Sequence, residues 1–337
     1  MTTIERIQAT GIRRIGTPDR GFRYQRVDGG RVTAADLARI RSMRIPPAWT
    51  DVAINSAATG RVQVVGKDAA GRWQYVYHDN HVRQREQKKF VRVIRFGESL
   101  PAMRRAVNRD LRKPDLSRER VLAGIVRILA AAFLRPGSEV YASEHGSYGV
   151  ATLRPRHVSV KGSTVTFRFR GKSGVIQETQ FDDKQVARLI RRLLKRANRR
   201  VFKYENGEGQ LVDVRAPAIN AYIREIMGDS FSAKDFRTWS GTLICACSLA
   251  RRRAADAEHE RSVKRMVVAA IKETARALGN TPAVCRGSYI CPAVINAFEK
   301  GKTLSDFFKG MEHLAAYRSP RLHPAEKQLL KLLKKSN

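Results

Sequence analysis

One arginine stands in a local setting that suits recognition of a phosphate group, and a second stands where a predicted helix ends. Arg237 lies between the aromatic residues Phe236 and Trp239, and packing against rings can hold a guanidinium rigid for bidentate contact with phosphate oxygens. Arg135 comes directly before Pro136, where an apolar segment that we predict to be helical ends. Taken in isolation, Arg237 could instead form an ordinary ion pair, and Arg135 could cap a helix C-terminus.

Lys172 lies at the predicted tip of a β-hairpin. Residues 164–170 alternate with period two, residues 175–181 form the return strand, and Gly171 opens the turn between them. A phosphate-binding P-loop is excluded, because it needs glycine at position 166, which is Thr, and must open a helix rather than a strand. The lysine is therefore either an ordinary exposed residue or one that a hairpin presents to a phosphate or a groove.

Asn280 and Tyr289 lie close to helix breakers. Residues 278–282 read Leu-Gly-Asn-Thr-Pro, which indicates that one helix stops here and another begins. Tyr289 lies between Gly287 and Pro292. A tyrosine in this position is either a half-buried packing residue or a hydroxyl nucleophile.

The chain is strongly basic. Its 337 residues include 65 Lys and Arg but 31 Asp and Glu, which gives a net charge of +34 and a pI near 11.0. An enzyme of small neutral metabolites has no use for such self-repulsion, whereas a polyanion relieves it, so we expect DNA or RNA as the partner. A membrane surface is the weaker interpretation, because the basic residues are spread along the whole chain. Arg154, Arg156 and His157 are candidates for phosphate contacts or belong simply to a basic surface.

The cysteines and apolar segments exclude other classes of protein. Four cysteines, at positions 245, 247, 285 and 291, fit neither a disulfide framework nor a zinc site, so we expect small buried residues and no metal. Residues 1–16 lack the apolar core of a signal peptide. The longest apolar stretch, Val121–Leu134, is too short to span a bilayer. We therefore expect a reducing aqueous compartment, either the cytoplasm with its nucleoid or the nucleus.

The elements predict an α+β protein with two domains. Residues 1–90 are expected to form a small β-rich domain, with a helix that starts at Thr33, and residues 91–337 a larger, mainly helical domain that carries the Lys172 hairpin. The charged stretch 82–96 is expected to be a solvated helix or a connection between the domains. The helices expected after it open at Ser117 and cover residues 183–200, 216–227, 233–278 in pieces, 292–300 and, as a basic amphipathic helix, 324–335.

In this order, the motifs resemble those of the type IB DNA topoisomerases, specifically the short poxvirus-like and bacterial branch. The resemblance covers the chain from about residue 20 to about residue 310. It implies a catalytic domain of the kind shared with tyrosine recombinases, preceded by a DNA-binding domain. The motifs that carry it are IPPAW at 45–49, GKDAAGRWQYVYH at 66–78, Arg-Pro-Gly at 135–137, GKSG at 171–174, KDFRTWSGT at 234–242 and SYICP at 288–292.

The resemblance implies a role for each candidate residue. Tyr289 would attack a DNA phosphodiester, form a 3′-phosphotyrosyl bond and free a 5′-hydroxyl. Arg135 and Arg237 would bind the non-bridging oxygens, whose charge grows in the transition state. Lys172 would protonate the leaving 5′-oxygen, and nearby cations, Arg168 among them, would have to lower its pKa from about 10.4. No ATP is implied, since the covalent bond conserves the phosphodiester energy, and no metal or other cofactor, since arginine and lysine would replace a metal as electrophile.

Two positions depart from the family's common pattern. Asn280 stands where many members have histidine and some bacterial members have asparagine. An amide can donate a hydrogen bond to a phosphate oxygen, but it cannot titrate. Cys291 also stands where histidine is common, and there we expect an effect on packing rather than on chemistry.

Double-stranded DNA is the partner that the resemblance implies. Two domains joined near residues 85–100 would close as a C-shaped clamp around the duplex, and the protein would act as a monomer. Such a clamp neutralises phosphates on all sides, in keeping with the diffuse charge. The expected DNA-binding residues are Gln74, Tyr75, Tyr77 and Tyr141, at positions where the family contacts DNA, and the basic residues Arg154, Arg156 and Arg168.

Three alternatives stay open on the sequence alone. A tyrosine recombinase shares the chemistry, but its signature has histidine three residues before the second arginine, where Lys234 stands. A non-catalytic DNA-binding protein would explain the charge but not the five catalytic-type residues. A membrane-surface protein would use the basic helix at 324–335, which gives only weak, salt-sensitive binding.

Overall fold

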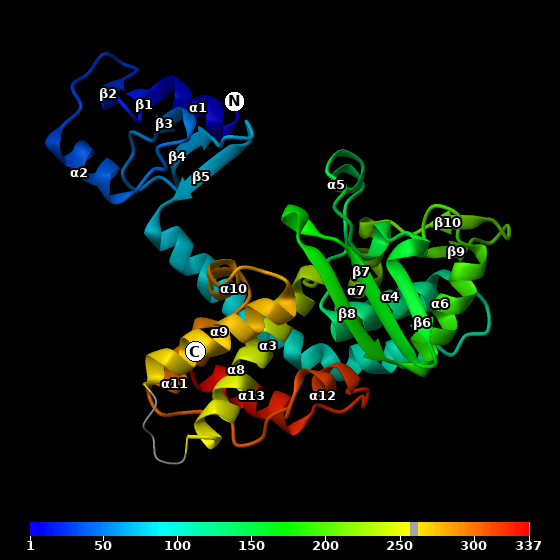
Figure 1. The fold of residues 1–337 in the computed structure, drawn as a ribbon. Helices are drawn as coiled ribbons and strands as arrows, with labels where there is room; N and C mark the ends of the chain where they lie inside the picture. The colour runs from blue at the N-terminus through cyan, green and yellow to red at the C-terminus, as the bar shows by residue number, and fades with distance from the viewer. Residues whose placement is uncertain (257–261, 337) are drawn as a thin grey trace. The chain divides into compact units, whose positions relative to one another are not determined.

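The computed structural model describes residues 1–256 and 262–336, which form two compact units, Met1–Lys89 and Phe90–Asn337. The first unit is a small antiparallel sheet with two helices, and the second is mainly helical with short strands (Figure 1). This arrangement confirms the α+β class that the sequence predicts. One helix, α3 (Asp79–Asp110), begins in the first unit and ends in the second.

The first unit contains a five-stranded sheet in the order β2-β1-β3-β4-β5. Because side chains alternate across a strand, neighbouring residues of β4 face opposite sides. Val64 packs with Ile40 of α2, and Val65 packs with Ile7 of α1, so the two helices cover opposite faces. The elements are α1 (Thr3–Thr10), β1 (Ile12–Thr17), β2 (Gly21–Arg26), α2 (Ala34–Ser42), β3 (Thr50–Ile54), β4 (Val62–Lys67) and β5 (Trp73–Tyr77).

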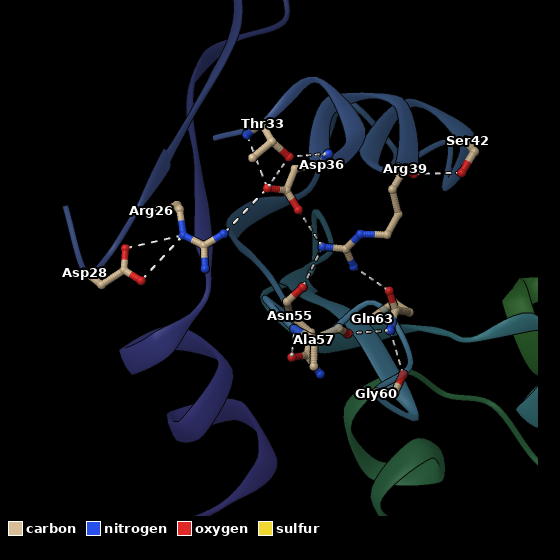
Figure 2. Close-up of polar contacts among 10 residues, drawn as sticks. All are labelled: Arg26, Asp28, Thr33, Asp36, Arg39, Ser42, Asn55, Ala57, Gly60 and Gln63. Atoms are coloured by element: carbon tan, nitrogen blue, oxygen red, sulfur yellow. Dashed lines mark hydrogen bonds and ion pairs between the residues drawn. The ribbon is translucent and has the colours of Figure 1, made fainter. Parts of the chain in front are cut away.

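A network of polar side chains fastens α2 to the sheet (Figure 2). The expected cap is present, because the Thr33 hydroxyl accepts from the Asp36 backbone N–H while the Asp36 carboxylate accepts from Thr33. Arg39 donates to Gln63 Oε1 at 2.6 Å and to the carbonyl oxygen of Asn55 at 2.9 Å. Some of the many arginines are thus bound within the fold.

The second unit is built around a single hydrophobic core with α4 at its centre. Its strands form a three-stranded sheet, β6-β7-β8, and a two-stranded one, β9-β10. The strands are β6 (Val158–Lys161), β7 (Thr164–Arg170), β8 (Ile176–Asp182), β9 (Lys203–Glu205) and β10 (Leu211–Asp213). The helices after α3 are α4 (Arg118–Ala132), α5 (Glu139–Glu144), α6 (Lys184–Arg196), α7 (Ala216–Met227), α8 (Ala233–Ala254), α9 (Val263–Leu278), α10 (Pro282–Ser288), α11 (Pro292–Glu299), α12 (Met311–Ala316) and α13 (Pro324–Lys335).

Several expected boundaries need correction. The charged stretch 82–96 is part of the longer helix α3. This helix is not solvated throughout, because its residues Phe96 and Leu100 are buried in the core of the second unit. Helix α6 ends at Arg196 rather than at residue 200. Helix α4 ends at Ala132, where Phe133 takes a left-handed conformation (φ 55°). Arg135 therefore lies beyond the helix and does not cap it.

The C-terminal helix α13 has the expected bounds, but its apolar face is already occupied. Leu329, Leu330 and Leu333 are buried in the core, where α13 packs against α8 and α11. A membrane anchor would need this face exposed, so the membrane-surface alternative is wrong for this helix. In the part of the chain that the structure describes, no helix combines the length and apolar character needed to cross a bilayer.

The cysteines behave as the sequence predicts. All four are buried, and burial raises the pKa of the Cys245 thiol to about 12. Within residues 1–256 and 262–336, His, Cys, Asp and Glu side chains form no group that could hold a metal ion.

Candidate active site

A cleft of about 840 Å³ opens in the second unit between strand β8 and the ends of helices α4, α9 and α10. Four of the five candidate catalytic residues line it: Arg135, Lys172, Asn280 and Tyr289. They come from segments up to 154 residues apart (289 − 135), so the fold is what brings them together. The fifth, Arg237, contacts Tyr289 and is only 3% exposed.

Arg237 is held at the junction of two helix ends. Its Nη1 donates to the carbonyl oxygen of Phe133, just past α4, and its Nη2 to that of Leu278 at 2.8 Å, at the end of α9. The Arg237 guanidinium carbon lies 4.9 Å from the ring centroid of Tyr289. Its Nε is buried and has no hydrogen-bond partner in the described chain.

The prediction that Phe236 and Trp239 pack against the Arg237 guanidinium is wrong. Phe236 and Trp239 point into the core, where they pack with Phe96 at centroid distances of 5.0 and 6.3 Å. Residues one or two positions apart on a helix face different directions, so neither ring stacks on the arginine. The ring beside Arg237 belongs to Tyr289 instead. Among the described residues the ordinary ion pair is not seen either, because the guanidinium donates to two carbonyl oxygens and contacts Tyr289.

Arg135 and Asn280 are joined by a direct hydrogen bond, in which Arg135 Nη2 donates to Asn280 Oδ1. The expected helix stop positions Asn280, since Gly279 is left-handed (φ 58°) and Asn280 N–H donates to Ala275 O at 2.9 Å. Because the oxygen of the amide is bound, its Nδ2 must act as a donor. That nitrogen is buried and has no partner among the described residues.

Lys172 lies in the turn of the predicted hairpin and is exposed. The turn closes through Gly171 N–H to Val175 O at 2.8 Å. A neighbouring segment also holds it, because Ser147 Oγ donates to Gly171 O at 3.1 Å. Arg168, expected to act on the lysine, is 3.4 Å from Glu178, which offsets its charge.

Three cations act on the Tyr289 hydroxyl. Burial alone would raise the pKa of this group, but the charges of Arg237, Arg135 and Lys234 outweigh burial and hold the pKa below its ordinary value. Burial together with the charge of Arg135 likewise lowers the pKa of Arg237. Tyr289 is therefore a phenol whose ionised form is favoured by its surroundings.

Comparison with known proteins gives matches over nearly the whole chain. Residues 78–290 match the family model of the catalytic core of eukaryotic DNA topoisomerase I, and residues 21–68 match that of the N-terminal domain of bacterial DNA topoisomerase IB. The DNA topoisomerase 1B of Acanthamoeba polyphaga mimivirus is 32% identical over 294 residues, covering 86% of this chain and 88% of the relative. The chain belongs to the type IB DNA topoisomerases. This confirms the family that the motifs indicate.

More distant relatives cover the chain less completely. Vaccinia virus (strain Copenhagen) DNA topoisomerase 1B is 24% identical over 263 residues, which are 76% of this chain and 80% of the relative. DNA topoisomerase 1 of Schizosaccharomyces pombe is 29% identical over 168 residues, covering 48% of this chain but 19% of the relative. The similarity to the large cellular enzymes is thus confined to part of them.

The expected DNA-contacting residues of the first unit lie on β5. Tyr75 is 39% exposed, and its ring stacks on that of Tyr77 at 6.1 Å. Gln74 donates to Asp68 Oδ2 at 2.8 Å, so its amide already has one partner within the fold.

In the second unit, the expected DNA-contacting residues differ in their surroundings. Tyr141 is well exposed on α5, and Arg154 lies over the ring of Tyr148, 5.4 Å from its centroid. Arg156 donates to His157. His157 itself is buried, and burial together with the two arginines lowers its pKa to about 4. Because His157 is buried and its pKa is lowered, it supplies no positive charge near neutral pH for a phosphate contact.

Sequence reasoning missed one part of the type IB cleft. Gln177 and Thr179 of β8 line it, and the motifs did not single them out. The period-two alternation of the return strand contained the signal, since it places both on the same face as buried Phe181.

Proposed function

We propose that this type IB topoisomerase relaxes supercoiled duplex DNA by cutting one strand, allowing it to rotate and resealing it. One observation carries the proposal: a single cleft brings Arg135, Lys172 and Asn280 to Tyr289, whose ring contacts Arg237. A tyrosine among fixed cations and amide donors suits nucleophilic attack on a phosphodiester.

In the proposed cleavage step, each candidate residue has one role. Tyr289 first loses its phenolic proton to water, and its Oη then forms a bond to phosphorus. The bond from phosphorus to the 5′-oxygen breaks, and the Lys172 ammonium gives that oxygen its proton. Arg237 Nε and Asn280 Nδ2, which have no partner in the described chain, are the donors left for the non-bridging oxygens. Arg135 orients the Asn280 amide and adds its own positive charge.

Religation reverses these steps. The free 5′-hydroxyl attacks the 3′-phosphotyrosyl bond, Tyr289 leaves as a phenolate, and the proton returns to Lys172. The covalent bond conserves the energy of the phosphodiester, so the cycle needs no ATP. Arginine and lysine supply the positive charge at phosphorus, so chelation of divalent metals should leave the reaction intact.

Plasmid relaxation tests this function directly. Negatively supercoiled plasmid is incubated with the protein in EDTA without ATP, and the topoisomers are separated by electrophoresis. Relaxation to a ladder of topoisomers supports the proposal. DNA binding without relaxation would favour the non-catalytic DNA-binding protein and would contradict it.

The DNA-contact residues named above are proposed to bind the duplex, with the enzyme acting as a monomer on chromosomal DNA in the cytoplasm. Binding should weaken steeply with salt, because each phosphate contact releases counterions. Between 50 and 200 mM salt we expect a loss of about 10³-fold or more if roughly six phosphates are neutralised. Fluorescence anisotropy of a labelled duplex measures this slope, and a flat response would contradict a DNA-encircling mode.

Cleavage should depend on pH through Tyr289. Lys234→Gln removes one of the cations that lower the pKa of Tyr289, so the pKa should rise and the phenolate fraction at a given pH should fall. The rising limb of the single-turnover rate against pH should therefore move to higher pH, with wild-type rates regained at its upper end. Lys195→Gln, an exposed lysine of α6, controls for the loss of one charge. Equal profiles for both variants would contradict this role of Lys234.

A further inference from the structure

The side chain of Gln177 fills the space between two glycines that belong to different parts of the cleft. A β-carbon at position 171 would lie 2.6 Å from Gln177 Cγ. One at position 279 would lie 2.7 Å from Gln177 Nε2 and 2.8 Å from Cδ. Such contacts are closer than van der Waals packing allows. The aliphatic part of Gln177 therefore rests on the turn beside Lys172, and its amide rests on the end of α9 beside Asn280.

Gly171 is the more informative of the two glycines. Gly279 has φ 58°, a backbone conformation that favours glycine whatever its neighbours. Gly171 has φ −94°, which any residue can adopt. Glycine is needed at this position because a β-carbon would have no room, and not because of the backbone conformation. The atom that a β-carbon would meet first is Gln177 Cγ.

The turn is fixed differently on its other side. There Tyr148 N–H donates to Arg170 O at 2.8 Å, and Ser147 Oγ donates to Gly171 O at 3.1 Å. The same segment reaches the anion-binding arginine, since Val150 N–H donates to Arg135 O at 2.9 Å. These hydrogen bonds connect the hairpin to Arg135. In the described chain, the contact between the turn and the segment of Asn280 is made by the side chain of Gln177.

We propose that Gln177 is a positioning residue that holds the Lys172 turn against the end of α9, and so sets the lysine relative to Asn280, Arg237 and Tyr289. The proposal rests on the proposed function, because it assigns the consequence of this packing to proton donation by Lys172. The contact is one of shape, so a side chain of similar length should replace glutamine, whereas alanine should not.

The test uses single-turnover cleavage of two duplex substrates, one with the natural 5′-oxygen at the cleavage site and one with a bridging 5′-sulfur. Gln177→Ala should slow cleavage of the oxygen substrate by about 10- to 100-fold, since displacement of a catalytic group by about 1 Å costs this much. It should leave the sulfur substrate close to the wild-type rate, because a thiolate leaves without a proton. Gln177→Met should retain most of the rate on both, and Gln185→Ala, a glutamine on α6 outside the cleft, controls for the same truncation.

A second variant tests the packing itself. Gly171→Ala should mimic Gln177→Ala, because its methyl group would overlap Gln177 Cγ. The double variant should be no slower than Gln177→Ala alone, because truncation of Gln177 removes the atom that the methyl group meets. Additive losses in the double variant would overturn the proposal.

Other outcomes separate this inference from the function on which it rests. Equal slowing of both substrates by Gln177→Ala, or a Gln177→Met enzyme as slow as the alanine variant, would overturn the positioning role while wild-type cleavage stands. An unchanged rate for Gln177→Ala would overturn it as well. Absence of cleavage by the wild-type enzyme would overturn the proposed function itself.

Discussion

Tyr289→Phe is expected to abolish strand cleavage and plasmid relaxation while leaving DNA affinity unchanged. The substitution removes one oxygen atom and keeps the ring that packs over Arg237. Without the hydroxyl no phosphotyrosyl bond can form, and loss of a nucleophile typically costs about 10⁴-fold or more in rate. Gel assays of relaxation, together with denaturing gels for the protein–DNA adduct, measure the effect. Binding of a labelled duplex measures retention of affinity.

The control is Tyr204→Phe, a tyrosine of β9 outside the cleft, which should relax plasmid as the wild type does. Wild-type enzyme stopped with denaturant should carry DNA through its 3′ end, and the modified peptide should contain Tyr289. Residual relaxation by Tyr289→Phe, or a modified peptide from another part of the chain, would contradict the assignment of the nucleophile.

The parts of the fold that depend on neighbouring residues could be predicted from the sequence. Thr33 with Asp36 signalled the start of α2, and Leu-Gly-Asn-Thr-Pro at 278–282 signalled the end of α9 and the start of α10. The alternation in 164–170 gave the bounds of β7. Caps, turns and strand periodicity are set by side chains within a few positions of one another, so a single sequence contains enough information.

Features that depend on distant partners could not be predicted in this way. Arg127 is the one charged residue of the apolar stretch Val121–Leu134, yet it is buried and donates to Asp183 Oδ2 at 3.0 Å. Burial lowers the pKa of this arginine to about 10. Helix α6 ends at Arg196, where Ala197 is extended, and beyond it Val201 N–H is bound to Leu153 O at 3.0 Å. Nothing near these positions in the sequence names the partner.

The candidate site shows the same division. Residue types and motifs pointed to Arg135, Lys172, Arg237, Asn280 and Tyr289, but each had an ordinary structural interpretation until the family resemblance was considered. The predicted environment of Arg237 was wrong, because the two rings next to it in the sequence face the core. The ring that contacts it belongs to Tyr289, 52 positions further along the chain (289 − 237). Gln177 escaped notice because its role depends on Gly171 and Gly279 lying on either side of it in space.

Lys172→Ala is expected to slow cleavage of an ordinary phosphodiester by about 10²- to 10⁴-fold, the usual contribution of a positioned general acid. The 5′-oxygen is a poor leaving group without a proton, whereas a thiol with a pKa of about 8.5 leaves readily as its anion. The variant should therefore cleave the substrate with a bridging 5′-sulfur at close to the wild-type rate. Single-turnover cleavage of matched oxygen and sulfur duplexes measures the ratio.

Lys172→Arg separates proton donation from charge. The guanidinium keeps the positive charge at the exposed hairpin turn, but with a pKa above 12 it is a poor proton donor near neutral pH. If Lys172 acts as the acid, the arginine variant should be slow on oxygen and fast on sulfur, like the alanine variant. If the lysine serves only to attract the phosphate, arginine should restore cleavage of the oxygen substrate, and the sulfur substrate should bring no recovery to the alanine variant. Since both arms use the same protein and the same binding site, a general loss of folding would slow both substrates alike and could not mimic the expected result.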